Sequence, residues 1–315
     1  SWLALGRIGP EEDFGGGVDG LIAGPGEEPL AAHIGLPVEK HTAVPDFSDF
    51  EGLSYFAPGP IVPYNFSFGC PWLRCTFCPE RAEKSPYLGV KTIVAASQIE
   101  ALARRWSPIL FHFTDNEISP LYLRALAARP PGAPWYGFAR FTPLLADPGF
   151  CASLAASGCR LLQLGLESGD QGVLDALDKG IDLGVVERAL SCLREAGIGV
   201  YIYILFGTPA EDRGSALRTR DFLARNARGI AFINVAIFNM PVTSPEAAVL
   251  STRPFYEGDL GLYCEFAHPR GWNRGEIRDF IASELEGEPS IRAILRRNPP
   301  IFTSNHAPFF VQPRT

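Results

Sequence analysis

Three cysteines lie close together in the chain, at Cys70, Cys75 and Cys78. Cysteine thiolates are soft ligands that suit both iron–sulfur clusters and zinc. A structural zinc site normally has four cysteine or histidine ligands, and the next histidine after these cysteines is His112, beyond a predicted helix. Three thiolates can instead hold an iron–sulfur cluster that leaves one iron open to a small molecule. A zinc or other metal loop, and three thiols with no common role, remain as alternatives.

The cysteines follow the first of several short apolar runs that alternate with amphipathic helical stretches. This alternation is typical of parallel βα units. The predicted strands are residues 64–68, 109–113, 135–141, 160–166, 199–206 and 231–238. The sequence therefore predicts an α/β fold, a partial (β/α)6 TIM-like barrel.

The helices between these strands have recognisable start and stop signals. Ser97 and Glu100 form a capping-box pattern, which predicts that a helix begins at Ser97. Asp147 predicts a second start, and Asp182 predicts a third, whose apolar stripe ends at Gly197. These stripes predict packing against the sheet, and we assign them no chemistry.

Polar residues follow the predicted strands at their carboxyl ends, where parallel α/β barrels place their chemistry. An arginine there can clamp a carboxylate, and a glutamate can accept hydrogen bonds from two neighbouring hydroxyl groups. Turn formation, strand termination and surface ion pairs are the structural alternatives for these residue types. The candidate binding residues are Thr114, Asp115, Asn116, Glu117, Arg140, Glu167, Ser168, Gly207, Pro209 and Asn239.

The cysteine loop resembles that of the radical S-adenosylmethionine (SAM) enzymes, whose usual spacing is C-x3-C-x2-C with an aromatic residue before the last cysteine. Phe77 supplies that aromatic residue and is thereby a further candidate cofactor-binding residue, and Gly69 and Pro71 are similar to the family's opening. The first gap here has four residues, from Pro71 to Arg74. With the strand ends included, the resemblance covers residues 61–242, and it suggests the cobalamin-associated branch of the family.

The resemblance implies that Cys70, Cys75 and Cys78 hold a [4Fe-4S] cluster whose open iron binds SAM. Reductive cleavage of SAM would give a 5′-deoxyadenosyl radical, a step that requires no general base, so no catalytic side chain is nominated. Each strand end would hold one part of SAM: residues 114–117 the amino group, Arg140 the carboxylate, Glu167 and Ser168 the ribose, Gly207 and Pro209 the adenine region, and Asn239 either SAM or substrate.

Lys179 also matches a recurring element of the family, and we expect it to be structural or to lie at the surface.

Three parts are predicted along the chain: an N-terminal segment and linker at 1–60, the barrel at 61–242, and an extension at 243–315 that covers the barrel mouth. The stretch from Val18 to Leu30 resembles the last piece of a cobalamin-binding domain, but the Asp-x-His-x-x-Gly motif is absent and about 60 residues cannot build that domain. Either a preceding domain is missing or cobalamin has been lost, so cobalamin is only a possible third cofactor.

The composition limits the partners. The net charge of −7 comes with no dense basic stripe, which disfavours nucleic acid, and no apolar run is long enough to span a bilayer. We expect a cytoplasmic protein whose other cysteines are reduced. The expected partners are a small-molecule or peptide substrate and an electron donor such as flavodoxin or ferredoxin. A non-catalytic cluster or SAM binder and a zinc-stabilised barrel are the other functions considered.

Overall fold

A computed structural model describes residues 26–37, 43–255, 261–299 and 306–311. The strands are β1 (Ile61–Tyr64), β2 (Ser67–Phe68), β3 (Leu88–Gly89), β4 (Leu110–Phe113), β5 (Trp135–Ala139), β6 (Cys159–Glu167), β7 (Gly199–Phe206), β8 (Phe232–Ile237), β9 (Met240–Pro241), β10 (Thr252–Pro254) and β11 (Tyr263–Phe266). The helices are α1 (Glu27–His33), α2 (Pro79–Ala82), α3 (Thr92–Trp106), α4 (Pro120–Ala128), α5 (Pro148–Ala156), α6 (Gln171–Ala176), α7 (Leu183–Ala196), α8 (Arg213–Arg225), α9 (Pro245–Val249), α10 (Arg274–Phe280) and α11 (Pro289–Leu295).

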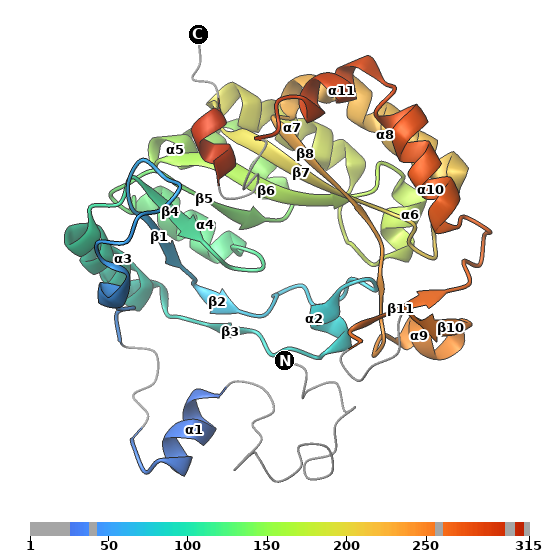
Figure 1. Ribbon diagram of the computed structural model, residues 1–315. Coiled ribbons are helices and arrows are strands. Elements are labelled where there is room, and N and C mark those ends of the chain that lie inside the picture. The colour runs from blue at the N-terminus through green and yellow to red at the C-terminus, as the bar shows by residue number, and fades with distance from the viewer. Residues whose placement is uncertain (1–25, 38–42, 256–260, 300–305, 312–315) are drawn as a thin grey trace.

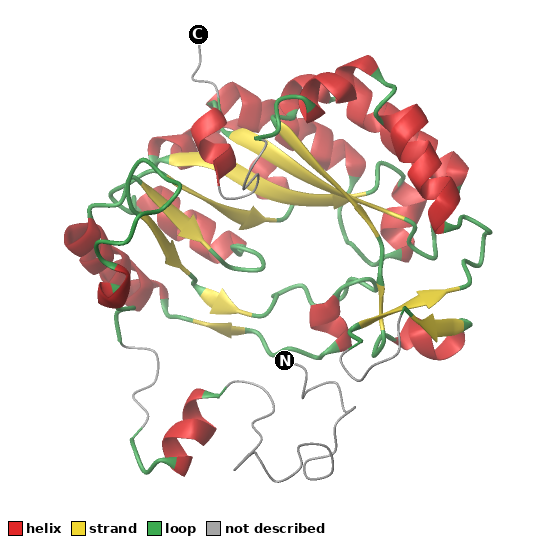
Figure 2. Cartoon of the chain, viewed as in Figure 1, coloured by secondary structure: helices red, strands yellow, loops and turns green. Residues whose placement is uncertain are grey.

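A six-stranded sheet in the order β1-β4-β5-β6-β7-β8 forms the body of the molecule. Each neighbouring pair in it is parallel. The sheet curves, helices cover its outer face, and the two edge strands β1 and β8 leave the barrel open (Figure 1). The layers of strand and helix are separate in Figure 2. The predicted α/β fold and partial barrel are confirmed.

Apolar side chains fill both faces of the sheet. The larger core lies between the strands and the outer helices and includes Phe113, Trp135 and Leu190, each at most 1% exposed. Inside the barrel, a second cluster closes the amino ends of the strands, where Tyr136 and Tyr201 pack with Ala307 from the C-terminal region. The carboxyl ends are therefore the open end, as expected for a barrel of this kind.

Two sequence predictions placed boundaries wrongly. The first strand covers Ile61–Tyr64 and not 64–68, because the backbone N–H of Phe66 donates to the Asp115 carboxylate at 3.0 Å and not to the neighbouring strand. Helix α3 begins at Thr92 and not at Ser97. Ala95, 1% exposed and two residues before Ser97, already packs in the core, and this packing extends the helix past the capping-box pattern.

Other helix start and stop signals were predicted correctly. The Asp147 carboxylate accepts from the Phe150 backbone N–H, and that of Asp182 accepts from Val185, so both residues cap helices. Gly197 ends α7 in left-handed backbone with φ 77°. Each signal is local in sequence, which is why it could be read without the fold.

The region after β8 adds a small sheet and two outer helices to the barrel. Strands β9–β11 form a small sheet on the side of the cysteine loop, where Phe77 packs beside Phe238 and Met240 (Figure 1). Helices α10 and α11 extend the outer helical layer beside α8.

Val18 to Pro25, part of the stretch predicted to resemble a cobalamin-binding domain, lies outside the described residues. Among the described helices, none combines the length and apolarity that crossing a bilayer requires.

Candidate cluster and SAM site

The three cysteines lie between β2 and α2, on the segment that leaves the carboxyl end of β1. Cys75 is buried, and Cys70 and Cys78 are partly buried. Burial is the main reason why the pKa of all three thiols is raised, and the pKa of Cys78, to which the neighbouring Cys75 and Cys70 add smaller effects, is raised to about 11. The three sulfur atoms are thus near enough to interact, and a metal that binds them must displace their protons.

No group of three or more His, Cys, Asp or Glu side chains within the described part of the chain converges as a single metal ion requires. In an iron–sulfur cube each thiolate binds a different iron, so convergence of the sulfurs on one point is not needed. The cysteine geometry therefore gives no support to the zinc alternative.

The cysteine loop is fastened to the segment between α6 and α7. The Thr76 backbone N–H donates to the Leu177 carbonyl oxygen at 3.0 Å. The Trp72 indole N–H donates to the Asp178 carbonyl oxygen at 2.8 Å, and Arg74 forms an ion pair with the Asp178 carboxylate at 3.0 Å. The longer first gap thus places Trp72 and Arg74 against a second loop.

Arg140 follows β5, and its side chain is 10% exposed. The guanidinium carbon lies 4.6 Å from the centre of the Trp72 ring. Its Nη2 donates to the Lys179 carbonyl oxygen, its Nε lies 3.6 Å from a Glu117 oxygen, and its Nη1 lies 3.9 Å from Cys75 Sγ. This cation is therefore held directly beside the thiols.

Glu117 lies between this arginine and the first cysteine. Its carboxylate is 4% exposed and accepts from Cys70 Sγ at 3.6 Å. Burial raises the pKa of Glu117, and the opposing effect of the Arg140 charge is smaller. The segment after β4 thus places the carboxyl group of Glu117 beside the Cys70 thiol and the Arg140 guanidinium.

Glu167 ends β6 in left-handed backbone, with φ 65°, where the pairing with β7 shifts register after Gly165. A residue other than glycine costs about 1–3 kcal/mol there, and such strain is concentrated at functional sites. The Glu167 carboxylate accepts from Lys179 Nζ at 2.8 Å, with side-chain exposures of 12% and 7%. Lys179 is buried, so a surface position for it is wrong.

Asp115 supports the cysteine loop from the end of β4. It is 1% exposed, and its carboxylate accepts from the Phe66 N–H at 3.0 Å and from the Ser67 hydroxyl at 2.7 Å. Its neighbours Thr114 and Asn116 are exposed at the same edge of the sheet. Asp115 therefore holds the start of the loop in place.

Ser168 is fully buried and directed toward helix α8. Its hydroxyl lies 3.0 Å from the Thr219 hydroxyl and accepts from the Asp170 N–H at 3.1 Å. The Thr219 hydroxyl also accepts from the Gly169 N–H at 2.9 Å. These contacts fix the turn after β6 and direct the Ser168 hydroxyl away from the cysteines.

Gly207 follows β7 with φ 83°, a backbone conformation that favours glycine. Its N–H donates to Glu211, which is fully buried and also accepts from the Trp272 indole at 3.2 Å. Pro209 is partly buried beside them. The segment predicted to lie near adenine is thus braced by a buried carboxyl group.

Asn239, after β8, is exposed, and its side-chain oxygen accepts from Arg274 at 2.8 Å.

The family model of the radical SAM superfamily matches residues 64–223, about half of the chain. This chain belongs to the radical SAM superfamily. Members of the superfamily use a [4Fe-4S] cluster and SAM, and the matched residues contain the three cysteines and most of the predicted strand-end positions.

Among curated proteins, this radical SAM chain is similar to bacteriochlorophyllide d C-12(1)-methyltransferase of Chlorobaculum tepidum, with 26% identity over 53% of this chain and 38% of the relative. Among solved structures, TsrM of Kitasatospora setae, a radical SAM methyltransferase described with tryptophan and a SAM analogue bound, matches with a TM-score of 0.58 and 20% identity. The match covers 71% of this chain and 51% of TsrM.

OxsB, described as a cobalamin-dependent SAM radical enzyme with aqua-cobalamin and SAM bound, matches with a TM-score of 0.58 and 14% identity over 71% of this chain and 41% of OxsB. The structural matches show the shared fold. The chain spans about half or less of the length of each of these proteins.

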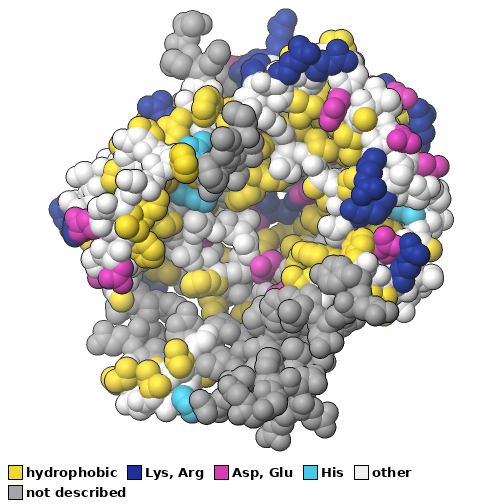
Figure 3. Space-filling model, viewed as in Figure 1, with side chains coloured by type: hydrophobic (Ala, Val, Ile, Leu, Met, Phe, Trp, Pro, Cys, Tyr) yellow, Lys and Arg dark blue, Asp and Glu magenta, His cyan; other side chains and the backbone are white. Residues whose placement is uncertain are grey.

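The residues of this radical SAM chain fit the cluster and SAM. Three adjacent thiols supply the soft donors, and the nearly buried Arg140 beside Cys75 supplies a partner for a carboxylate. In the space-filling view the molecule is hollowed between the sheet and the loops below it, and acidic and basic side chains gather there (Figure 3). Sequence reasoning did not predict that Trp72 and Asp178 take part in this site. The unusual cysteine spacing was the one signal in the sequence that this loop differs from the usual one.

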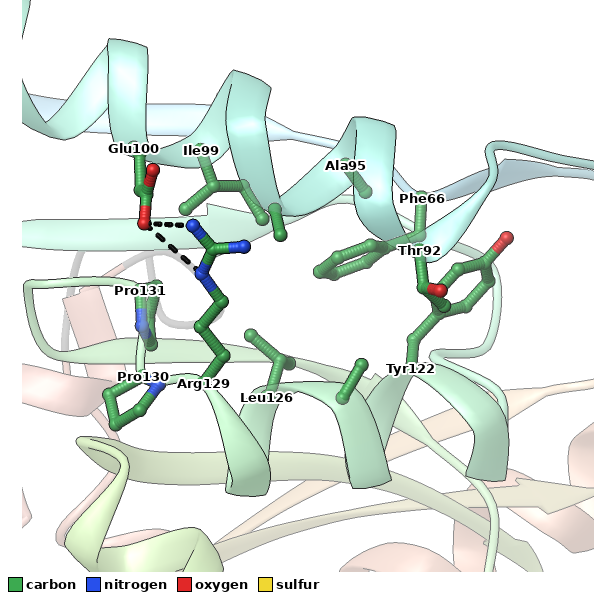
Figure 4. Close-up of a pocket in the computed structure, with 12 residues that line it drawn as sticks. Phe66, Thr92, Ala95, Ile99, Glu100, Tyr122, Leu126, Arg129, Pro130 and Pro131 are labelled. Atoms are coloured by element: carbon green, nitrogen blue, oxygen red, sulfur yellow. Dashed lines mark hydrogen bonds and ion pairs between the residues drawn. The ribbon is translucent and has the colours of Figure 1, made fainter.

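A second hollow lies on the outer surface between α3 and α4 (Figure 4). It is lined by Ile99, Tyr122 and Leu126 and bordered by the ion pair of Glu100 with Arg129. Its volume of about 30 Å³ is close to that of one water molecule, too small for SAM or a substrate.

Proposed function

We propose that this radical SAM enzyme holds a [4Fe-4S] cluster through Cys70, Cys75 and Cys78, binds SAM beside it, and modifies a small-molecule or peptide substrate. Methylation and C–H or carbon-skeleton chemistry are the reaction classes. The position of Arg140 carries the proposal, because this nearly buried cation lies 3.9 Å from Cys75 Sγ. A carboxylate that binds Arg140 is thereby brought next to the thiols.

The other charged residues complete the SAM site. Arg140 binds the SAM carboxylate, which replaces part of the contact between Arg140 and Glu117. Glu117 then accepts a hydrogen bond from the SAM amino group. Glu167 accepts from the ribose hydroxyls, and Lys179 Nζ, which donates to the Glu167 carboxylate at 2.8 Å, holds that carboxylate in place. Ser168 and Asp115 position the loops and are not proposed to touch SAM.

When bound, the cluster supplies the electron that breaks a carbon–sulfur bond of SAM. The protein keeps the sulfonium close to the thiols and limits the access of water, because Arg140, Glu117, Glu167 and Lys179 are all nearly buried. An electron carrier such as flavodoxin or ferredoxin is the proposed source of the electron.

Relatives support methylation as the leading reaction class. The curated relative is named as a methyltransferase of a bacteriochlorophyllide, and TsrM is described as a methyltransferase with tryptophan as its substrate. Both TsrM and OxsB are described with cobalamin bound, so cobalamin is proposed as an additional cofactor.

The test is anaerobic reconstitution with iron and sulfide, followed by reduction in the presence of SAM. We expect close to four irons per chain and release of 5′-deoxyadenosine. Cys75→Ala should lose most of the iron, whereas Cys192→Ala, a thiol on α7, should retain it. Equal iron content in both variants would refute the ligand assignment, and a loaded protein that never cleaves SAM would refute the enzymatic activity.

A further inference from the structure

The four-residue first gap of the cysteine loop delivers one aromatic side chain to the SAM site. Leu73 adopts left-handed backbone with φ 46°, which turns the chain sharply between Trp72 and Cys75. The Trp72 indole N–H then donates to the Asp178 carbonyl oxygen at 2.8 Å, a bond between residues 106 positions apart. Trp72 thus has a fixed position although it lies on a loop.

Trp72 covers one face of the Arg140 guanidinium at 4.6 Å from the ring centre. The edge of the same guanidinium donates to the Lys179 carbonyl oxygen. A planar guanidinium that is stacked on one face and bonded along one edge loses most of its freedom to rotate. Its remaining N–H groups are then directed at a defined place beside Cys75.

Gly180 makes this stacking possible. It adopts φ 66°, and a Cβ atom at this position would lie 2.1 Å from the Trp72 ring. Any larger residue would therefore push the ring away from Arg140 or displace the loop. The cysteine gap and the 177–180 segment are matched to each other through this contact.

From these contacts we propose that Trp72 is a positioning residue for SAM binding: it holds Arg140 in the orientation that receives the SAM carboxylate. The inference rests on the proposed function, because Arg140 acts there as the carboxylate clamp. It also gives the four-residue gap a physical role, which is to place an aromatic ring under the clamp.

The experiment measures equilibrium binding of two ligands to the anaerobically reconstituted protein without reductant. SAM carries the carboxylate, and 5′-methylthioadenosine has the same nucleoside but lacks the amino acid part. In Trp72→Ala we expect the Kd for SAM to rise about ten-fold, as loss of a partly buried cation–π contact implies, with the Kd for 5′-methylthioadenosine and the iron content unchanged. Trp72→Phe should restore most of the affinity, and Gly180→Ala should resemble Trp72→Ala.

The matched control is Trp106→Ala, which removes another Trp–Arg stack, with Arg105 at 4.5 Å, at the far end of α3. It should change neither Kd value by more than about two-fold, which is the usual scatter of such measurements. Equal weakening of both ligands in Trp72→Ala, loss of iron, or unchanged SAM binding would each overturn the positioning role. If the unsubstituted protein binds no iron or no SAM, the proposed function itself fails, which is a distinct result.

Discussion

At the residue scale, two nearly buried ion pairs flank the cysteine loop, Arg140 with Glu117 and Lys179 with Glu167. Placing four charged groups in a poorly hydrated site is unfavourable unless each is paired, so the presence of these pairs is weak evidence for a role in stability and is better explained by a role in binding. The strained backbone of Glu167, with φ 65°, agrees with this reading. We therefore expect each pair to be sensitive to loss of one partner.

Lys179→Met tests this expectation. It leaves the Glu167 carboxylate buried without its cation, so the free energy of unfolding should fall by about 3 kcal/mol. Urea denaturation measures it, with Arg225→Ala as the control, because the Arg225–Glu187 pair is about half exposed and should change stability by less than about 0.5 kcal/mol. An unchanged urea midpoint in Lys179→Met would contradict the burial of the pair.

Sequence reasoning reached Arg140 and Glu167 because both directly follow an apolar strand, and parallel strands end at one edge of a sheet. It could not reach the Trp72–Asp178 contact, since that contact joins two loops 106 positions apart. The buried state of Lys179 was missed for the same reason.

At the scale of elements, the turn after β7 depends on Glu211. This carboxyl group is fully buried, and one of its oxygens accepts from the Gly207 N–H and the Trp272 indole while the other has no partner among the described residues. Burial raises the pKa of Glu211 to about 8 from its ordinary value of 4.5. The folded protein therefore keeps a proton there that the unfolded chain releases.

The pH dependence follows from this difference. Between the unfolded pKa of 4.5 and the folded pKa of about 8, the free energy of unfolding should fall as pH rises, by at most about 1.4 kcal/mol per pH unit. Glu211→Gln mimics the protonated side chain and should flatten this slope. Chemical denaturation at pH 5, 6, 7 and 8 compares the two proteins, and parallel slopes would show that Glu211 is ionised throughout.

Helix ends were predictable where the signal is local and isolated, as at Asp182 and Gly197. The start of α3 was not, because the core contact of Ala95 overrides the capping pattern at Ser97 and Glu100. Likewise β1 ends at Tyr64, since Asp115, 49 residues farther along the chain than Phe66, takes the next backbone N–H. Tertiary contacts of this kind set boundaries that sequence periodicity cannot.

At the scale of the whole molecule, the alternation of strands and helices was sufficient to predict the partial barrel. The C-terminal region was less predictable, because Ala307 plugs the amino ends of the strands while β9–β11 lie by the cysteine loop. The division into parts at 1–60, 61–242 and 243–315 stays a prediction.

The central claim is that the cluster has an open iron and that Arg140 presents SAM to it. Electron paramagnetic resonance of the reduced, reconstituted protein tests this most directly, with and without SAM. The account predicts that SAM changes the spectrum of the cluster, and that Arg140→Ala requires at least about ten-fold more SAM for the same change. A cluster signal that SAM leaves unaltered at saturating concentration would contradict it.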